Sequence, residues 1–269
     1  MEYMGGVRRI TYIITRRCTL KCKLCISKTP YFENPKDDTY TQSKKYIDNF
    51  FSIVNGVEIF SIAGGEPLII KDIAGVMEYA FSYRDKIKST LDIVTNATIP
   101  FPNDLIKVLG KNKDKSRVII SYYGESLSKK KDFIVKQLEE NHINYRVQDY
   151  AANKNWTYGG WVDFGDDTLK YNDTEELKKH ADSCIFRQGK YYVINFGELH
   201  PCNRQFWRMY KNIIKKDDDF FIDLSADDFD IESAGKKLMA LDSLEILPSC
   251  PYCNGCKKDS IRFRPAEQL

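Results

Sequence analysis

The sequence predicts an α/β protein: a partial (β/α)6 barrel of the TIM type, followed by a small C-terminal α+β module. Short runs of β-branched and aromatic residues alternate with stretches of helical periodicity as far as Tyr150. Strands separated by helices favour parallel βαβ units with right-handed crossovers. With 269 residues, 42% of them hydrophobic, the chain can build one large domain and a small appendage.

The expected elements of the barrel follow one another regularly. Strands are expected at residues 9–15, 57–62, 90–95, 117–122 and 145–150, and helices at 41–54, 72–83, 104–109 and 130–141. A loop rich in Asn, Gly and aromatic residues then covers 153–165 and changes the composition of the chain. We therefore expect two domains, comprising residues 1–165 and 166–269.

The second part predicts shorter elements. Thr174 is a suitable N-cap for a helix, with two glutamates next to it in the first turn. A hairpin strand is expected at 190–195 with its turn at 196–198, and leucines at three-residue steps predict a helix over 233–247. The aspartates at 217–219 and 227–228 lack the spacing and central glycine of an EF-hand, so we expect solvated loops there.

Charge and hydropathy exclude several classes of partner. The 41 basic and 38 acidic residues are interspersed and give a formal charge of +3, so we expect no nucleic acid and no membrane partner. Residues 1–9 contain no apolar core of signal-peptide length, and no later run approaches the length of a membrane span. We expect a cytoplasmic protein.

The eight cysteines form two groups, and metal ligation explains this better than disulfides or unligated buried thiols. Cys18, Cys22 and Cys25 form a C-x3-C-x2-C run directly after the first expected strand. Three thiolates leave one coordination position open, which suits a catalytic centre rather than a structural one. Chemistry in α/β folds lies in loops at the carboxyl ends of strands, where this run is expected.

This cysteine loop resembles that of the radical S-adenosylmethionine (radical SAM) superfamily. The resemblance implies that the three cysteines hold a 4Fe–4S cluster whose fourth iron chelates the methionyl amine and carboxylate of S-adenosylmethionine (AdoMet). Leu24 stands where relatives carry an apolar residue that borders the adenine. Gly64, Gly65 and Glu66, with the proline that follows, match the second motif, whose backbone and carboxylate meet the methionyl amine.

Three further positions are similar to AdoMet contacts of the family. Asn96 lies in a Thr-Asn-Ala-Thr stretch that resembles the family's Thr-Asn-Gly-Thr, with Ala97 replacing the glycine. The resemblance places Ser121 near the ribose and Arg146 within reach of the methionyl carboxylate. Ordinary polarity at strand ends would explain these residues equally well.

The C-terminal cysteines are similar to the shortened auxiliary-cluster module called Twitch, which is related to the longer SPASM domain. One pair, Cys184 and Cys202, lies astride the expected hairpin, and Cys250 and Cys253 follow near the end. The resemblance implies a second 4Fe–4S cluster saturated by four thiolates, suited to electron transfer. A zinc knot would use the same four residues. Cys256 could replace Cys253, face the substrate or be spare.

The resemblance implies reductive cleavage of AdoMet to a 5'-deoxyadenosyl radical that removes a hydrogen atom from a substrate, with an external one-electron donor such as flavodoxin or ferredoxin. We expect a small polar substrate, a sugar or aminocyclitol alcohol oxidised to a ketone, with the auxiliary cluster taking the second electron. One alternative is a maturase that oxidises, epimerises or cross-links a ribosomal peptide, with Trp156, Tyr158 and Trp161 lining its groove. Another is a non-enzymatic metal-stabilised binding or electron-transfer module, which would not require the Gly-Gly-Glu motif.

Overall fold

The computed structural model describes residues 7–152 and 155–269. The expectation for the N-terminus falls mostly on residues 1–6, and Asn153 opens the expected boundary loop; these positions lie outside the described residues. Within the described part, no helix is long and apolar enough to cross a membrane.

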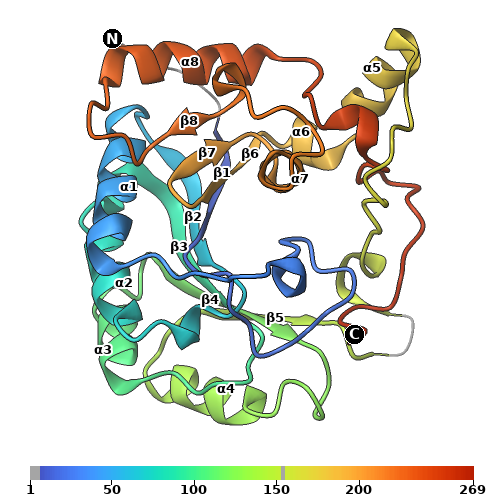
Figure 1. Cartoon of the computed structure of the whole chain (residues 1–269). Coiled ribbons are helices and arrows are strands. Elements are labelled where there is room, and N and C mark those ends of the chain that lie inside the picture. Colours follow the sequence, from blue (N-terminus) through green and yellow to red (C-terminus); the bar gives the residue numbers. More distant parts are fainter. Residues whose placement is uncertain (1–6, 153–154) are drawn as a thin grey trace.

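The described strands form one open, mostly parallel eight-stranded sheet in the order β5-β4-β3-β2-β1-β6-β7-β8 (Figure 1). Strands β1 to β6 run parallel to one another, whereas β7 pairs antiparallel with β6 and with β8. This confirms the partial-barrel fold class. The strands are β1 Arg9–Ile13, β2 Val57–Ala63, β3 Ile87–Thr95, β4 Ser116–Tyr122, β5 Tyr145–Asp149, β6 Tyr191–Asn195, β7 Glu198–His200 and β8 Ile222–Asp223.

Helices α1 to α4 follow the first four strands in turn and cover one face of the sheet (Figure 1). The α-helices are α1 Tyr40–Ser52, α2 Ile73–Phe81, α3 Asn103–Lys111, α4 Lys131–Glu140, α5 Thr174–Asp182, α6 Ile185–Gln188, α7 Asn203–Tyr210 and α8 Ile231–Ser243. Short 3-10 helices occur at Thr29–Tyr31, Pro67–Ile69, Arg84–Lys86, Thr157–Gly159, Asp218–Phe220 and Cys250–Tyr252.

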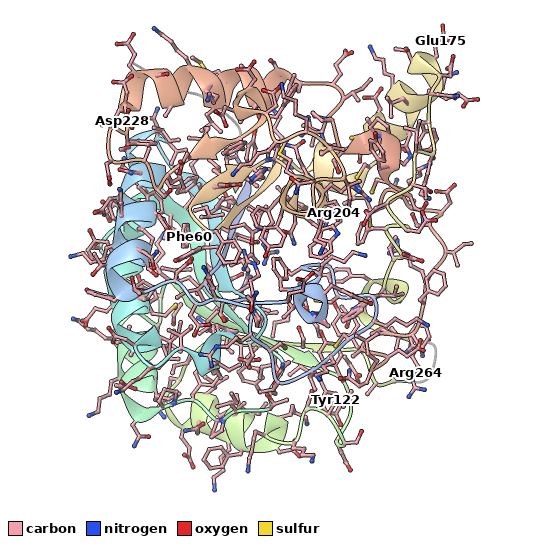
Figure 2. The ribbon with its side chains drawn as sticks, in the orientation of Figure 1. Phe60, Tyr122, Glu175, Arg204, Asp228 and Arg264 are labelled. Carbon is pink, nitrogen blue, oxygen red and sulfur yellow. The ribbon has the colours of Figure 1, made fainter. Side chains whose placement is uncertain are left out.

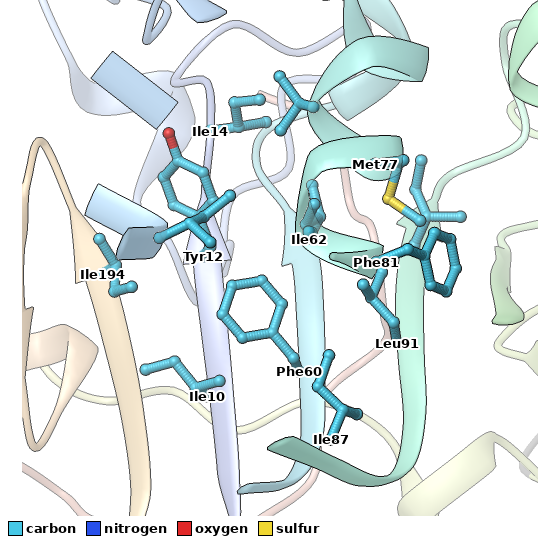
Figure 3. Close-up of a cluster of buried hydrophobic side chains, with 14 of the residues drawn as sticks. Ile10, Tyr12, Ile14, Phe60, Ile62, Met77, Phe81, Ile87, Leu91 and Ile194 are labelled. Carbon is cyan, nitrogen blue, oxygen red and sulfur yellow. The ribbon is translucent and has the colours of Figure 1, made fainter. Parts of the chain in front are cut away.

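The helix-covered face of the sheet is the main hydrophobic core. Ile10, Phe60, Leu91 and Ile194 come from four different strands, alternate residues of which point to this face, and all four are fully buried (Figure 3). The opposite face carries charge: Asp92 is fully buried there and accepts two hydrogen bonds from the Arg117 guanidinium, at 3.1 and 2.8 Å. The apolar and polar faces therefore separate on the two sides of one sheet.

The sheet continues past the expected boundary between residues 165 and 166. Strand β6 pairs with β1, with Asn195 opposite Ile13, and the hairpin expected at this point is present as β6 and β7. Leu238 and Leu241 of α8 belong to the same core as the barrel helices. The division into two domains remains a prediction, and the two parts share their sheet and core.

Three helix ends, one in α5 and both in α8, differ from the sequence-based expectation. Asp173, and not Thr174, caps α5, since its carboxylate accepts a hydrogen bond from the Glu176 amide at 2.9 Å. Helix α8 begins earlier because Asp230 caps it through the Ser233 amide at 2.8 Å, and it ends earlier because Leu244 is extended. Local capping determines both N-terminal ends.

Replacing a buried residue of α8 tests whether this helix is part of the main core. Leu238→Ala should lower the free energy of unfolding by about 2–5 kcal/mol, because it opens a cavity where the side chain is fully buried. Met239→Ala is the matched control, since Met239 is 45% exposed, and should change it by less than about 0.5 kcal/mol. Urea denaturation would measure both; equal effects would contradict this packing.

Candidate active site with two cysteine clusters

The cysteine loop leaves β1 at the carboxyl edge of the parallel strands. Cys22 is buried and Cys18 and Cys25 are half-buried, packed with Leu20 and with Ala266 from the far end of the chain. Leu24 is half-buried beside Cys25. The structure therefore brings the three predicted ligands into one apolar cluster.

Amide donors surround two of the three sulfur atoms. Cys18 Sγ accepts hydrogen bonds from the Leu20 amide at 3.4 Å and from Asn96 Nδ2 at 3.5 Å. Cys22 Sγ accepts one from Gln268 Nε2 at 3.3 Å. Burial raises the pKa of Cys18 to about 12 and that of Cys22 to about 11. Such thiols ligate only when a metal displaces their protons, and the amide donors then stabilise the thiolates.

The C-terminal segment of the chain lies along this loop (Figure 1). Lys23 donates its amide to the Glu267 carbonyl at 2.8 Å, and Leu269 donates its amide to the Lys21 carbonyl at 2.9 Å. Gln268 adds two contacts, accepting from the Lys21 amide at 2.8 Å and donating to Cys22 Sγ. Sequence reasoning missed this pairing, because no local pattern links segments this far apart.

Gly64 and Gly65 let the end of β2 touch the start of the cysteine loop. The Gly65 amide donates to the Thr15 carbonyl at 2.8 Å, and the Glu66 amide to the Arg17 carbonyl at 2.9 Å. A Cβ atom on Gly65 would lie 2.1 Å from the Arg17 oxygen and 2.8 Å from Cys18 Cβ. No side chain fits in that space, so the glycine is required by close backbone approach.

The Glu66 carboxylate is fully buried and fastens the end of β3 to the loop. It accepts hydrogen bonds from Thr95 Oγ1 at 2.9 Å, the Leu68 amide at 3.2 Å and the Asn96 amide at 2.7 Å. Burial raises its pKa to about 7, against the opposing effect of these donors. Its predicted contact with a methionyl amine remains a prediction.

The Thr-Asn-Ala-Thr stretch contacts the cysteine loop directly. Asn96 Nδ2 also donates to Thr19 Oγ1 at 3.1 Å, and Thr98 and Thr19 share a hydroxyl contact at 2.6 Å. Ala97 is fully buried with φ of 58°, a left-handed conformation that glycine adopts more easily. The alanine therefore keeps the backbone shape for which relatives use glycine.

Ser121 and Arg146 lie further around the same sheet, on β4 and β5. Ser121 faces Gln148, two residues beyond Arg146, so both predicted contacts share the face opposite the helices. Ser121 is buried, whereas Arg146 is exposed with its guanidinium 5.7 Å from the Tyr158 ring centroid. Their roles toward AdoMet remain predictions.

An aromatic group lies beside the cysteine loop. Tyr123 stacks on Tyr150 with ring centroids 5.5 Å apart, and Trp161 meets the Tyr123 ring edge-on at 5.6 Å. Trp161 packs against the cysteine cluster, whereas Tyr158 is 61% exposed. Of the three aromatic residues expected along a substrate groove, Trp161 thus lies beside the three-cysteine loop.

The other four predicted ligands line a pocket in the C-terminal part of the chain. Its lining contains Cys184, Cys202, Cys250 and Cys253, together with Arg204 and several apolar side chains. Figure 2 labels Arg204. Cys256 is buried in one apolar cluster with Cys253, Val162 and Phe164, and its carbonyl accepts the Ile185 amide at 2.8 Å. The pocket thus brings together the four cysteines chosen from the sequence, and Cys256 packs beside one of them.

Backbone geometry presents these cysteines to the pocket. Cys184 is the N-cap of α6, Cys202 the N-cap of α7, and Cys250 begins a 3-10 helix. Gly255 has φ of 71°, and a Cβ atom there would lie 2.8 Å from the His180 ring. The Gly255 amide donates to Cys253 Sγ at 3.3 Å.

The pocket holds the thiols in different electrostatic environments. Burial raises the pKa of Cys250 to about 12. Burial also acts to raise the pKa of Cys202, but the positive charge of Arg204 and two backbone donors outweigh it, so this pKa is lowered. The thiolate form is therefore stabilised at Cys202 and not at Cys250.

The chemistry of these donors bears on which metal group fits. In the ranges that the structure describes, no three His, Cys, Asp or Glu side chains are grouped as ligands of a single ion. Soft thiolate donors, one set of three and one of four, are the kind of ligands that bind 4Fe–4S clusters.

Known proteins resemble part of this chain in sequence. A GTP 3',8-cyclase of Campylobacter jejuni is 31% identical over 119 residues, covering 42% of this chain and 35% of the relative. An S-adenosylmethionine-dependent nucleotide dehydratase of Selenomonas ruminantium is 32% identical over 91 residues, covering 34% and 30%. The chain spans about a third of the length of these curated relatives. No family model matches it.

Solved structures match the whole fold. BtrN in complex with AdoMet and 2-DOIA aligns with a TM-score of 0.60 and 13% identity, covering 98% of this chain and 99% of that one. anSMEcpe with bound AdoMet aligns with a TM-score of 0.55 and 14% identity, covering 97% and 92%.

The chain has the fold of the radical SAM enzymes, which are its neighbours in both sequence and structure. Enzymes of this class bind AdoMet and 4Fe–4S clusters. The resemblance drawn from the two cysteine groups is therefore confirmed.

Adding one methyl group at Gly65 tests the close approach behind the cysteine loop. Gly65→Ala should lower the free energy of unfolding by at least about 1–3 kcal/mol, because its Cβ would collide with the Arg17 carbonyl. Gly110→Ala is the control: nothing lies within 4 Å of its Cβ and it is inside α3, so stability should rise by about 0.5–1 kcal/mol. Urea denaturation measures both. A Gly65→Ala protein as stable as the wild type would refute this account.

Proposed function

We propose that this protein is a radical SAM dehydrogenase that oxidises an alcohol of a small polar substrate, such as a sugar or aminocyclitol, to a ketone. The observation that carries the proposal is the presence of two cysteine sites in one fold. One is a three-cysteine loop built into the Gly-Gly-Glu motif, and the other is a four-cysteine pocket.

The residues divide between two tasks in this proposal. Cys18, Cys22 and Cys25 would hold the cluster that, when bound, supplies the electron for AdoMet cleavage. The AdoMet contacts would come from the edge of the sheet above the loop: Leu24, Gly64, Gly65, Glu66, Asn96, Ser121 and Arg146. The Asn96 side chain donates a hydrogen bond to Cys18 Sγ, and its backbone amide donates one to the Glu66 carboxylate. Asn96 would therefore couple the cluster ligand to the AdoMet site.

The four-cysteine pocket would hold the acceptor of the second electron that the oxidation removes from the substrate. Removal of a hydrogen atom from the carbinol carbon leaves a substrate radical, which becomes a ketone by losing one proton and one electron. The proton passes to water or a base, and Cys184, Cys202, Cys250 and Cys253 would hold the electron acceptor. Four thiolates leave no iron open to a substrate, which suits electron transfer. An external donor such as flavodoxin or ferredoxin would supply the first electron.

The small polar substrate is supported by the match along almost the full length of both chains to BtrN, whose structure holds 2-DOIA. A peptide substrate is the second candidate, because anSMEcpe, which aligns with a TM-score of 0.51, has been solved with bound AdoMet and the Cp18Cys peptide. An electron carrier without enzymatic activity would not require the Gly-Gly-Glu motif, in which Gly65 packs closely against Arg17 and Cys18.

Transfer of substrate deuterium tests the reaction. The reduced, reconstituted protein is incubated with AdoMet and sugars or aminocyclitols deuterated at the carbinol carbon, and 5'-deoxyadenosine is analysed by mass spectrometry. We expect deuterium in 5'-deoxyadenosine and one ketone formed per transfer. The Cys18→Ala, Cys22→Ala, Cys25→Ala variant is the control and should form neither. No transfer from any alcohol of a broad panel, with transfer from a deuterated precursor peptide, would reject the dehydrogenase in favour of a maturase.

A further inference from the structure

Arg204 is a buried cation with an unpaired donor at the four-cysteine pocket. Its residue exposure is 3%, and its Nη1 has no hydrogen-bond partner among the described residues. The guanidinium carbon lies 4.4 Å from the ring centroid of Phe164 and 4.6 Å from that of Phe186, so two aromatic faces enclose it. Arg204, Phe164 and Phe186 all line the pocket.

Arg208, one turn further along α7, is a buried arginine whose hydrogen-bonding groups have partners. Arg208 is 1% exposed, and its Nε donates to Asp167 Oδ1 at 2.6 Å. Its Nη1 donates to the carbonyl and hydroxyl of Ser249 at 3.0 and 2.7 Å. The charges of both arginines reach Cys202 and Cys253. Asp167 balances Arg208, whereas no carboxylate of the described residues forms an ion pair with Arg204, whose charge also interacts with Cys184.

A buried guanidinium that has no carboxylate partner and one free donor is costly unless another anion compensates it. Four thiolates around an iron–sulfur cluster would be that anion, and reduction by one electron adds a further negative charge beside the guanidinium. Attraction between them is strong because the aromatic rings exclude water and lower the local dielectric. Positive charge at this position therefore favours the reduced form of the group more than the oxidised form.

We propose that Arg204 is a positioning residue that raises the reduction potential of the auxiliary cluster and so makes it an electron acceptor for substrate oxidation. The proposal rests on the proposed function, since it assumes that the four cysteines hold a 4Fe–4S cluster. It adds a residue that no cysteine motif contains.

Redox titration followed by electron paramagnetic resonance tests the role of this charge in the full-length, reconstituted protein. The variants are Arg204→Met and Arg204→Gln, which remove the charge, and Arg204→Lys, which keeps it. Lys211→Met, which removes an exposed charge near the end of the same helix, is the control. The auxiliary signal is the one that remains in the Cys18→Ala, Cys22→Ala, Cys25→Ala variant.

Both uncharged variants should lower the equilibrium constant for reducing the auxiliary cluster at least tenfold, about 59 mV for one electron. Arg204→Lys should restore most of it, and Lys211→Met should change it little because solvent screens that charge. The signal of the other cluster should not move. If removing the charge instead prevents the auxiliary cluster from assembling while Arg204→Lys assembles it, the charge serves to hold the cluster, and this result would contradict a role in setting its potential.

Equal potentials in the wild type and both uncharged variants would overturn the role of Arg204 and leave the proposed dehydrogenase reaction untouched. Loss of the cluster in all three Arg204 variants would also overturn that role, because it would indicate that the side chain is needed for packing. Zinc without iron in the module of the wild type would be a different result. It would remove the proposed electron acceptor, and with it both the dehydrogenase and this inference.

Discussion

The close contact between the end of β2 and the start of the cysteine loop is the constraint on which the candidate site depends. Backbone bonds from Gly65 and Glu66 continue the pairing of β1 and β2 beyond the regular strands. The carboxylate of Glu66 then fixes the end of β3, and Asn96 carries this chain of contacts to Cys18. One row of strand ends therefore determines where the first cysteine lies.

The second cysteine site depends on the same sheet. Strand β6 adds to the free side of β1, so the hairpin that delivers Cys202 is aligned with the strand that delivers Cys18. The Gln268 tail closes the arrangement from the far end of the chain by holding Cys22. Two cysteine sites built on one sheet suit a reaction in which an electron enters at one place and leaves at another.

Much of this was predictable from sequence, for identifiable reasons. Alternation of strand and helix patterns gave the fold class, because buried parallel strands require apolar runs and their covering helices require amphipathic ones. The spacing of Cys18, Cys22 and Cys25 predicted the candidate site, and so did the glycine pair after β2. Each of these two motifs is complete within a few consecutive residues, so a sequence pattern can show it. The hairpin at Phe196 was visible for the same local reason.

Features that depend on distant contacts could not be predicted. The Gln268 bond to Cys22 joins residues 246 positions apart, and the β1–β6 pairing needed knowledge of which sheet edge was free. Arg204 appeared as one of many basic residues, because only packing shows that Phe164 and Phe186 enclose it. The start of α5 was ambiguous in the sequence, because Asp173 and Thr174 are adjacent and both residue types cap helices; Asp173 is the N-cap.

The central claim is that the chain holds two 4Fe–4S clusters, and counting iron and acid-labile sulfide per chain tests it most directly. After anaerobic reconstitution, the wild type should contain about eight irons, and the Cys18→Ala, Cys22→Ala, Cys25→Ala variant about four. About four irons falling to none, with one zinc retained, would contradict the account. The C-terminal cysteines would then form a structural zinc site, and the two-electron oxidation would lose its acceptor.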